Sequence, residues 1–305
     1  MQFPKLSTDM LLARLEPPRG KIRMVLDTDT YNEIDDQFAL VYALRNPDRL
    51  QVEAVYAAPF SNERSSGPAD GMAKSYGEIL RLLDKMNIDS NGFVFKGSEE
   101  YLPAAFTPVA SEAAEDLVRK AMSGSDDPLY VTAIGAITNV ASAILMEPRI
   151  IEKIVVVWLG GHPWYWPDTK EFNLAQDVHA ARLLFDCGVP LVQIPCMGVA
   201  SHLLTNVPEL DLHYPKMDAV GKYLVDSFKG YSSDHFAWAK EIWDISAIAY
   251  LVNPDWAPSV LIHSPVLTDQ VTWSFDPRRH FVKMVHWLNR NAIFKDLFIK
   301  LCCND

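Results

Sequence analysis

The stretch VLDTDTYNEIDDQFAL, residues 25–40, determines how the rest of the chain is interpreted. Its apolar start predicts the end of a strand, which leads into Asp27 and Asp29. A short polar loop follows, and then Asp35 and Asp36 open a segment whose apolar residues have helical spacing. A strand, a short loop and a helix in this order form the first half of a βαβ unit, from which parallel sheets are built.

The same alternation of apolar runs and amphipathic segments continues along the chain. Short apolar runs predict strands at 21–27, 50–58, 129–133, 151–159 and 189–195. Helical spacing predicts helices at 35–44, 71–86, 138–146, 178–186, 243–252 and over most of 280–301. No repeat, linker or internal boundary interrupts the pattern. We therefore expect an α/β fold in a single domain, residues 1–305, with a central, mostly parallel sheet flanked by helices in a Rossmann-like arrangement.

The composition is typical of a globular protein, since 49% of the 305 residues are hydrophobic and 22% are charged. A net charge of −11 argues against a nucleic-acid polymer or an anionic membrane as partner, because both require a basic face. No apolar run approaches the ~20 residues that span a bilayer, and the N-terminal segment lacks the apolar core of a signal peptide. The cysteines form no C-x-x-C pair, so we expect reduced thiols in a cytoplasmic protein. They are Cys187, Cys196, Cys302 and Cys303.

The four acidic side chains of the opening stretch repel one another unless a positive charge lies between them. The N-terminus of a helix supplies only a partial positive charge. A calcium ion supplies much more, and it binds about six to eight oxygens, including carboxylates and main-chain carbonyls. The stretch therefore indicates a divalent-cation site. The alternative is a solvated acidic loop in which Asp35 caps the helix.

The same stretch also allows a second enzyme class. Asp-x-Asp after an apolar strand, here Asp27 and Asp29, resembles the haloacid dehalogenase-type phosphatases, in which Asp27 would be the nucleophile and Asp29 an acid/base beside magnesium. That class has a downstream lysine and a separate acidic motif far along the chain. Here the second acidic pair, Asp35 and Asp36, follows a few residues later on the next helix. The phosphatase is therefore the less favoured alternative.

Further motifs follow in order and carry a resemblance to a known family. The segment AIGAITNVASAILMEPRI, 133–150, is similar to the Thr-Gly-x-Leu-Thr-Asn-x-Ala run of nucleoside hydrolases, which ends in Glu-Pro. VVVWLGG, 155–161, followed by Glu-Phe-Asn at 171–173, and IWDISAIAYLVNP, 242–254, resemble later motifs of that family. Asn62 stands at the expected place after the second strand, in PFSN. The acidic stretch resembles the family's Asp-x-Asp to Asp-Asp signature, with a longer loop, TYNEI, that lacks the usual Pro-Gly.

This resemblance implies a calcium-dependent enzyme that hydrolyses the N-glycosidic bond between a ribose-like sugar and a base. The implied calcium ligands are the side chains of Asp29, Asp36 and Asp244 and the main-chain carbonyl of Ile134. The implied substrate-binding residues are Asp35 and Asn173 for the secondary hydroxyls, Glu171 and Asn62 for the rest of the ribose, and Trp243 for the base. Asp29 would be the general base, and attack by one water would invert the anomeric carbon. Relatives form dimers and tetramers, so a homodimer or homotetramer is expected.

The base side of the implied site departs from the family pattern. Many relatives carry a histidine directly before the late metal aspartate and use it as general acid, whereas this chain has Trp243, as purine-preferring relatives do. Tryptophan cannot donate a catalytic proton at neutral pH, so Trp243 is expected to stack on the base. His162, His202 and His235 are candidate donors that the sequence does not separate. A calcium-binding riboside-binding protein without hydrolase activity is therefore kept as an alternative.

Several of these residues also have a purely structural interpretation. Asp244 is placed to cap the helix that begins after it, and Glu171 and Asn173 could be ordinary polar residues of a loop. The aromatic side chains at 164–166 and 231–238 would either line the pocket or pack in the core.

Overall fold

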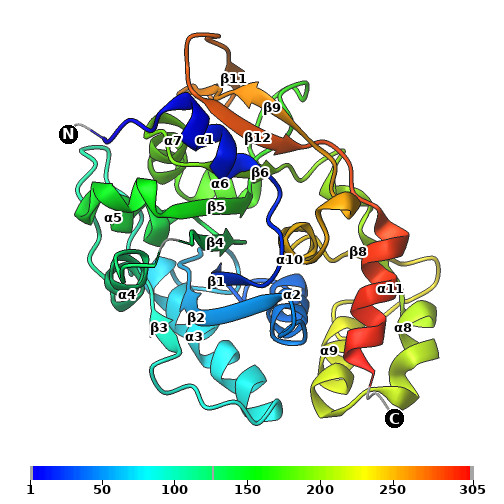
Figure 1. Cartoon of the computed structure of the whole chain (residues 1–305). Helices are drawn as coiled ribbons and strands as arrows, with labels where there is room; N and C mark the ends of the chain where they lie inside the picture. Colours follow the sequence, from blue (N-terminus) through cyan, green and yellow to red (C-terminus); the bar gives the residue numbers. More distant parts are fainter. Residues whose placement is uncertain (1–2, 126, 303–305) are drawn as a thin grey trace.

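The computed structural model describes residues 3–125 and 127–302, and its centre is an eight-stranded sheet (Figure 1). In sheet order the strands are β3 (Val94–Lys96), β2 (Leu50–Ala57), β1 (Ile22–Thr28), β4 (Leu129–Ala133), β5 (Ile154–Leu159), β6 (Leu191–Ile194), β12 (Phe281–Val285) and β9 (Ser259–His263). Neighbouring strands are parallel except for the last pair, β12 with β9. The predicted single α/β domain with a mostly parallel sheet is confirmed.

Helices cover both faces of the sheet, because the side chains of the central strands alternate between two apolar clusters. In β1, Met24 and Leu26 belong to one cluster and Val25 to the other. The first cluster includes residues of α1 (Thr8–Leu15), α2 (Ile34–Leu44), α3 (Pro68–Lys85), α8 (Val207–His213), α9 (Ala219–Lys229), α10 (Ile245–Val252) and α11 (Arg290–Leu301). The second includes residues of α4 (Glu112–Ala121), α5 (Thr138–Met146) and α7 (Val178–Asp186), and Figure 1 shows α4 and α5 on the opposite side of the sheet from α2 and α10.

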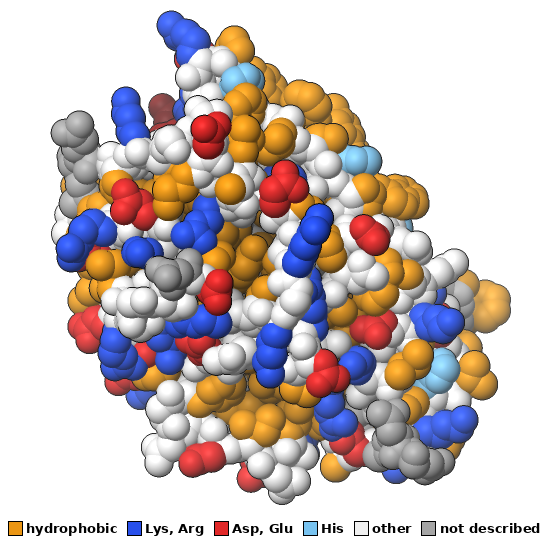
Figure 2. Space-filling model, viewed as in Figure 1, with side chains coloured by type: hydrophobic (Ala, Val, Ile, Leu, Met, Phe, Trp, Pro, Cys, Tyr) orange, Lys and Arg blue, Asp and Glu red, His pale blue; other side chains and the backbone are white. Residues whose placement is uncertain are grey.

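The remaining elements are short. They are α6 (Phe172–Gln176), the antiparallel pairs β7 (Leu204–Thr205) with β8 (Lys240–Glu241) and β10 (Val266–Leu267) with β11 (Trp273–Ser274), and the 3₁₀ turns Pro148–Glu152, Ala200–His202, Tyr214–Lys216 and Pro254–Trp256. No helix within the described residues is long and apolar enough to cross a membrane. Acidic, basic and apolar side chains are interspersed over the face of the molecule drawn in Figure 2.

The C-terminal region differs from the sequence prediction. Residues 280–301 were expected to be mostly helical, but Phe281–Val285 forms β12, and α11 begins only at Arg290. The segment FVKMV is short and rich in valine, and it completes the sheet by pairing with β6 on one side and β9 on the other. Sheet pairing with distant strands therefore overrides the local helical spacing.

Prolines move two other boundaries. The strand expected from Ile151 begins at Ile154, because Pro148–Glu152 forms a 3₁₀ turn with proline in its first turn. The helix expected from Gly71 begins earlier, at Pro68, where the fixed φ of proline suits the first helical position.

A buried hydrogen-bond network ties the centre of the sheet together. Asn139 on α5 donates through Nδ2 to Oδ1 of Asp27, at 2.7 Å, and to the carbonyl of Ala57, at 3.3 Å. The main-chain N–H of Ser98 donates to Oδ1 of Asn139, at 2.7 Å. Burial raises the pKa of Asp27 to about 7, and the bond from Asn139 partly opposes that rise. The side-chain amide of Asn139 therefore links α5 to the ends of β1 and β2 and to Ser98, which follows β3.

Replacing Asn139 with alanine removes the only hydrogen bond made by the buried Asp27 carboxylate to the described residues. An unsatisfied buried polar group costs the full loss of its solvation, so we expect the free energy of unfolding to fall by about 2–3 kcal/mol. Urea denaturation of the two proteins measures this difference. The exposed Asn91→Ala is the control, expected to change stability by less than about 0.5 kcal/mol; an equal effect of both substitutions would contradict the role of Asn139.

Candidate active site

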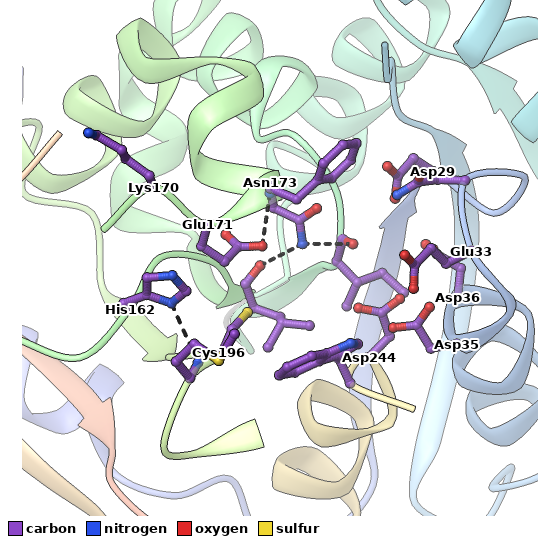
Figure 3. Close-up of a pocket in the computed structure, with 16 residues that line it drawn as sticks. Asp29, Glu33, Asp35, Asp36, His162, Lys170, Glu171, Asn173, Cys196 and Asp244 are labelled. Carbon is purple, nitrogen blue, oxygen red and sulfur yellow. Dashed lines mark hydrogen bonds between the residues drawn. The ribbon is translucent and has the colours of Figure 1, made fainter. Parts of the chain in front are cut away.

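The main pocket opens at the carboxyl edge of the parallel sheet, where ligands collect in open α/β folds (Figure 3). Its volume is about 290 Å³, close to the lower end of the range for small-molecule sites. The pocket brings together all the implied metal-binding and substrate-binding residues except Asn62. Those that line it are Asp29, Asp35, Asp36, Ile134, Glu171, Asn173, Trp243 and Asp244.

One part of the pocket is a cluster of buried carboxylates. Asp35 and Asp36, at the start of α2, and Asp244, just before α10, have carboxylate oxygens within 4.8 Å of one another. Asp29, beyond β1, lies next to them, and neither of its carboxylate oxygens has a hydrogen-bond partner within residues 3–125 and 127–302. Figure 3 shows Asp29, Asp35, Asp36 and Asp244 grouped on one side of the pocket. Segments more than two hundred positions apart in sequence thus meet at this cluster.

The cluster concentrates negative charge where water is largely excluded. Burial raises the pKa of Asp36 to about 7, although the hydroxyl of Thr28 donates to its Oδ1 at 2.5 Å. Burial, and then the neighbouring carboxylates, raise the pKa of Asp29 and Asp244 well above the usual value. The pKa of Asp35 is raised in the same way, with Lys240 opposing part of the rise. Buried carboxylates with unpartnered oxygens fit a metal ion, because a hard cation would supply the missing charge.

The backbone after β4 completes this side of the pocket. The carbonyl of Ile134 accepts a hydrogen bond from Nδ2 of Asn173 at 3.1 Å, and the same nitrogen donates to the carbonyl of Leu159 at 3.0 Å. Gly135 follows directly, and a Cβ there would lie 3.0 Å from Oδ1 of Asp29 and 3.2 Å from Cβ of Ala58. The absence of a side chain at Gly135 therefore allows the Asp29 carboxylate to lie against the backbone.

The structure distinguishes between the site and helix-cap interpretations of the acidic residues. Asp244 occupies the N-cap position of α10, but its side chain makes no capping hydrogen bond. Asp35 lies inside the first turn of α2, where the N-cap residue is Glu33. Glu171 does cap α6, since its carboxylate accepts from the N–H groups of Asn173, Leu174 and Gly161 at 2.9, 3.1 and 2.7 Å. Glu171 therefore combines a structural role with its place in the pocket.

Among the candidate proton donors, only His162 lines the pocket. The N–H of Met197 approaches its Nδ1 at 3.5 Å, and burial lowers the pKa of the ring. A ring nitrogen of His202 lies 2.7 Å from the carbonyl of Leu288, and one of His235 lies 3.0 Å from that of Lys229. The aromatic residues at 164–166 are exposed and do not line the pocket, whereas Trp243 does.

Several pocket residues were not found from the sequence. They are Asn32, Glu33, Leu159, Lys170, Phe172, Cys196 and Met197. The longer loop TYNEI was the available signal for Asn32 and Glu33, while Cys196 and Met197 follow β6 without any recognisable motif. Asn62 does not line the pocket; its Nδ2 donates to Oδ1 of Asn32 at 2.7 Å.

The phosphatase alternative is wrong. Its nucleophile would be Asp27, but this side chain is fully buried, bonded to Asn139 and absent from the pocket lining. Asp27, in β1, is thus directed toward Asn139 on α5, whereas Asp29, just beyond the strand, lines the pocket.

Comparison with known proteins defines the family. The model of the inosine-uridine preferring nucleoside hydrolase family matches residues 24–292. The chain belongs to this family, which confirms the resemblance and the predicted enzyme class, a hydrolase acting on N-glycosyl compounds. The non-specific ribonucleoside hydrolase RihC of Salmonella paratyphi B is 26% identical over 250 residues, 77% of this chain and 80% of that protein. The RihC of Shigella flexneri is 29% identical over 141 residues, 45% of this chain and 46% of that protein.

Solved structures show the same fold. A plant nucleoside hydrolase superposes with a TM-score of 0.73 at 19% identity, covering 93% of this chain and 99% of the other. A purine-preferring ribonucleoside hydrolase from Gardnerella vaginalis gives a TM-score of 0.68 at 18% identity, with 92% and 98% covered. At these identities the likeness concerns the architecture alone.

The repulsion within the cluster gives a testable consequence for stability. In excess chelator, Asp244→Asn removes one buried like charge, so we expect its melting temperature to exceed that of the wild type, by roughly 2–4 °C for each kcal/mol of repulsion relieved. Added calcium should reverse the order, because the wild type retains the full set of carboxylates. Thermal unfolding with and without calcium measures both effects. The exposed Asp255→Asn should follow the wild type throughout; a lower melting temperature of Asp244→Asn in chelator would contradict the repulsion.

Proposed function

We propose that the chain hydrolyses the N-glycosidic bond of a ribonucleoside or a related riboside, with calcium as cofactor. The observation that carries the proposal is one pocket that contains both a buried carboxylate cluster with unpartnered oxygens and the indole of Trp243. A cation site can hold a sugar diol, and a flat aromatic ring can hold a base. Family membership supports a riboside as the substrate class.

The residues that would hold the calcium ion are Asp29, Asp36, Asp244 and the carbonyl of Ile134. Their buried oxygens and hard-ligand chemistry fit calcium, which accepts carboxylate and main-chain oxygens in irregular geometry. When bound, the ion would lower the pKa of a water molecule and neutralise the cluster.

Asp29 is proposed as the general base. Its two carboxylate oxygens make no hydrogen bond to the described side chains or backbone, so they are available to accept a proton from an attacking water. Attack by a single water on one face of the sugar inverts the anomeric carbon, so a β-riboside would give α-ribose as first product.

Two side chains are proposed to bind the secondary hydroxyls of the ribose. Asn173 gives its Nδ2 to the carbonyls of Ile134 and Leu159, which leaves its Oδ1 as the acceptor for a sugar hydroxyl. Asp35 offers Oδ1, which has no partner in the described part of the chain. Glu171, which lines the pocket, is assigned to the rest of the ribose, whereas Asn62 does not line the pocket and contacts Asn32 instead.

Trp243 is proposed to stack on the leaving base, which favours a purine. Stacking does not supply a proton, and burial lowers the pKa of His162, the histidine that lines the pocket. A leaving group that accepts negative charge, or that solvent protonates, therefore suits this pocket best.

We further propose a cytoplasmic homodimer or homotetramer. The buried Cys187 and Cys196 thiols agree with a reducing compartment.

A second candidate function can be tested in the same assay. A calcium-binding riboside-binding protein without hydrolysis is favoured by one observation, the presence of Trp243 where many relatives have a general acid. Binding of purine ribosides in calcium with no release of free ribose would select this alternative. Release of ribose from any riboside in the panel would exclude it.

Asp29→Asn tests the general base. The amide keeps the size of the side chain but cannot take a proton, so we expect kcat for ribose release to fall by roughly 10²- to 10⁴-fold. A reducing-sugar assay on purine and pyrimidine ribosides measures the rate, and proton NMR of the first product gives the anomer. Asp255→Asn serves as the exposed control, and an active Asp29→Asn would remove Asp29 from the mechanism.

Trp243 is tested by a pair of substitutions. Loss of the indole in Trp243→Ala should lower kcat/KM for purine ribosides by about 5- to 150-fold, since a base–aromatic stack is worth about 1–3 kcal/mol. Trp243→Phe keeps an aromatic face, so we expect it to retain most of the activity. Equal losses in both variants would show that stacking is not the contribution of Trp243.

A further inference from the structure

The longer first loop brings a side chain into the pocket that has no assigned role. In the sequence, Asn32 stands between the proposed base Asp29 and the proposed diol ligand Asp35, and it lines the pocket while remaining only 7% exposed. Its main-chain N–H donates to the carbonyl of Asp29 at 2.7 Å, which closes a tight turn. The turn fixes where the Asn32 side chain begins.

A directional chain of hydrogen bonds then fixes how the Asn32 amide is turned. The main-chain N–H of Arg64 donates to Oδ1 of Asn62 at 2.9 Å, so the free end of Asn62 is its Nδ2 group. That group donates to Oδ1 of Asn32 at 2.7 Å. Because a main-chain N–H can only donate, each amide in the chain has a single consistent orientation. Asn32 is left to present its Nδ2 as a hydrogen-bond donor.

The donor has no acceptor in the protein. Within residues 3–125 and 127–302, no atom accepts a hydrogen bond from Nδ2 of Asn32. Protein atoms do not fully enclose this nitrogen, which agrees with a position facing the pocket. A donor held in a pocket without a protein partner is suited to a ligand acceptor.

The segment that orients Asn62 is itself well anchored. Ser61 exchanges two hydrogen bonds with the side chain of Gln176, at 2.7 and 3.2 Å. The guanidinium of Arg64 lies 4.9 Å from the centre of the Tyr31 ring, on the same loop as Asn32. The ammonium of Lys74 donates to the carbonyl of Arg64 at 2.8 Å. Both the orienting segment and the oriented loop are therefore fixed before a ligand arrives.

We propose that Asn32 donates a hydrogen bond to an oxygen of the ribose diol, and that Asn62 is a positioning residue that acts only through Asn32. The proposal rests on the proposed riboside hydrolysis. A sugar hydroxyl that gives its proton to Asp35 or to Oδ1 of Asn173 keeps lone pairs that need donors. Asp35 and that Oδ1 are acceptors, so Asn32 supplies the complementary group. The longer loop thus transfers to Asn32 the ribose contact that the sequence pattern assigns to Asn62.

The test is a double-mutant cycle on ribose release. Asn32→Ala removes the donor. Asn62→Asp keeps the acceptor for the Arg64 N–H but has no proton to donate, so Asn32 turns its amide and presents oxygen to the pocket. We expect each variant to lose roughly 3- to 10-fold in kcat/KM. The double variant should lose no more than Asn32→Ala alone, because Asn62 has no separate route to the substrate.

Substrates that lack one hydroxyl locate the contact. The loss caused by Asn32→Ala should disappear with the 2′-deoxy or with the 3′-deoxy riboside, whichever lacks the bonded oxygen, while Asn91→Ala is the exposed control and keeps wild-type rates. A loss of the same size on both deoxy substrates, or additive losses in the double variant, would overturn the proposal while leaving riboside hydrolysis intact. No ribose release by the wild type from any riboside would overturn both.

Discussion

The mutual repulsion of buried carboxylates at one edge of the sheet is the constraint on which the rest of this site depends. Asp29, Asp36 and Asp244 are nearly inaccessible to solvent, and burial is the first cause of the raised pKa of each. Such a cluster is unfavourable in the free protein and persists only because the surrounding packing is strong. The parallel sheet provides that packing, since both its faces are covered by apolar clusters. Stability is concentrated in the core, and the edge carries the unfavourable charge.

A second network directly beneath the cluster keeps its geometry fixed. Asp27 and Asp29 are two residues apart at the end of β1. Asp27 lies within the strand and Asp29 just beyond its end. Asp27 is bound by Asn139, which also reaches the end of β2, whereas Asp29 lies against Gly135 and has no partner within the described chain. One aspartate therefore stabilises the sheet edge, and the other is left for chemistry.

Much of the fold and the site could be predicted because short-range patterns determine them. The alternation of apolar strands and helices indicated the parallel sheet, and the residues just after strand ends included Asp29. The family resemblance supplied Ile134 and Glu171, and all three residues line the pocket. Long-range pairing could not be predicted in the same way: Phe281–Val285 is a strand only because β6 and β9 lie on either side of it. Asn32 was missed for a related reason, since its role depends on contact with Asn62, which lies on a separate loop.

The two pocket amides illustrate how identical side chains acquire opposite chemistry. Asn173 gives its N–H groups to the carbonyls of Ile134 and Leu159, so its oxygen faces the pocket. Asn32 receives a hydrogen bond at its oxygen from Asn62, so its nitrogen faces the pocket. In both cases the orientation traces back to main-chain groups, whose donor or acceptor character cannot change. A diol needs acceptors for its protons and donors for its lone pairs, and an acidic cluster alone supplies only acceptors. The backbone thus adds to the carboxylates the polarity that they lack.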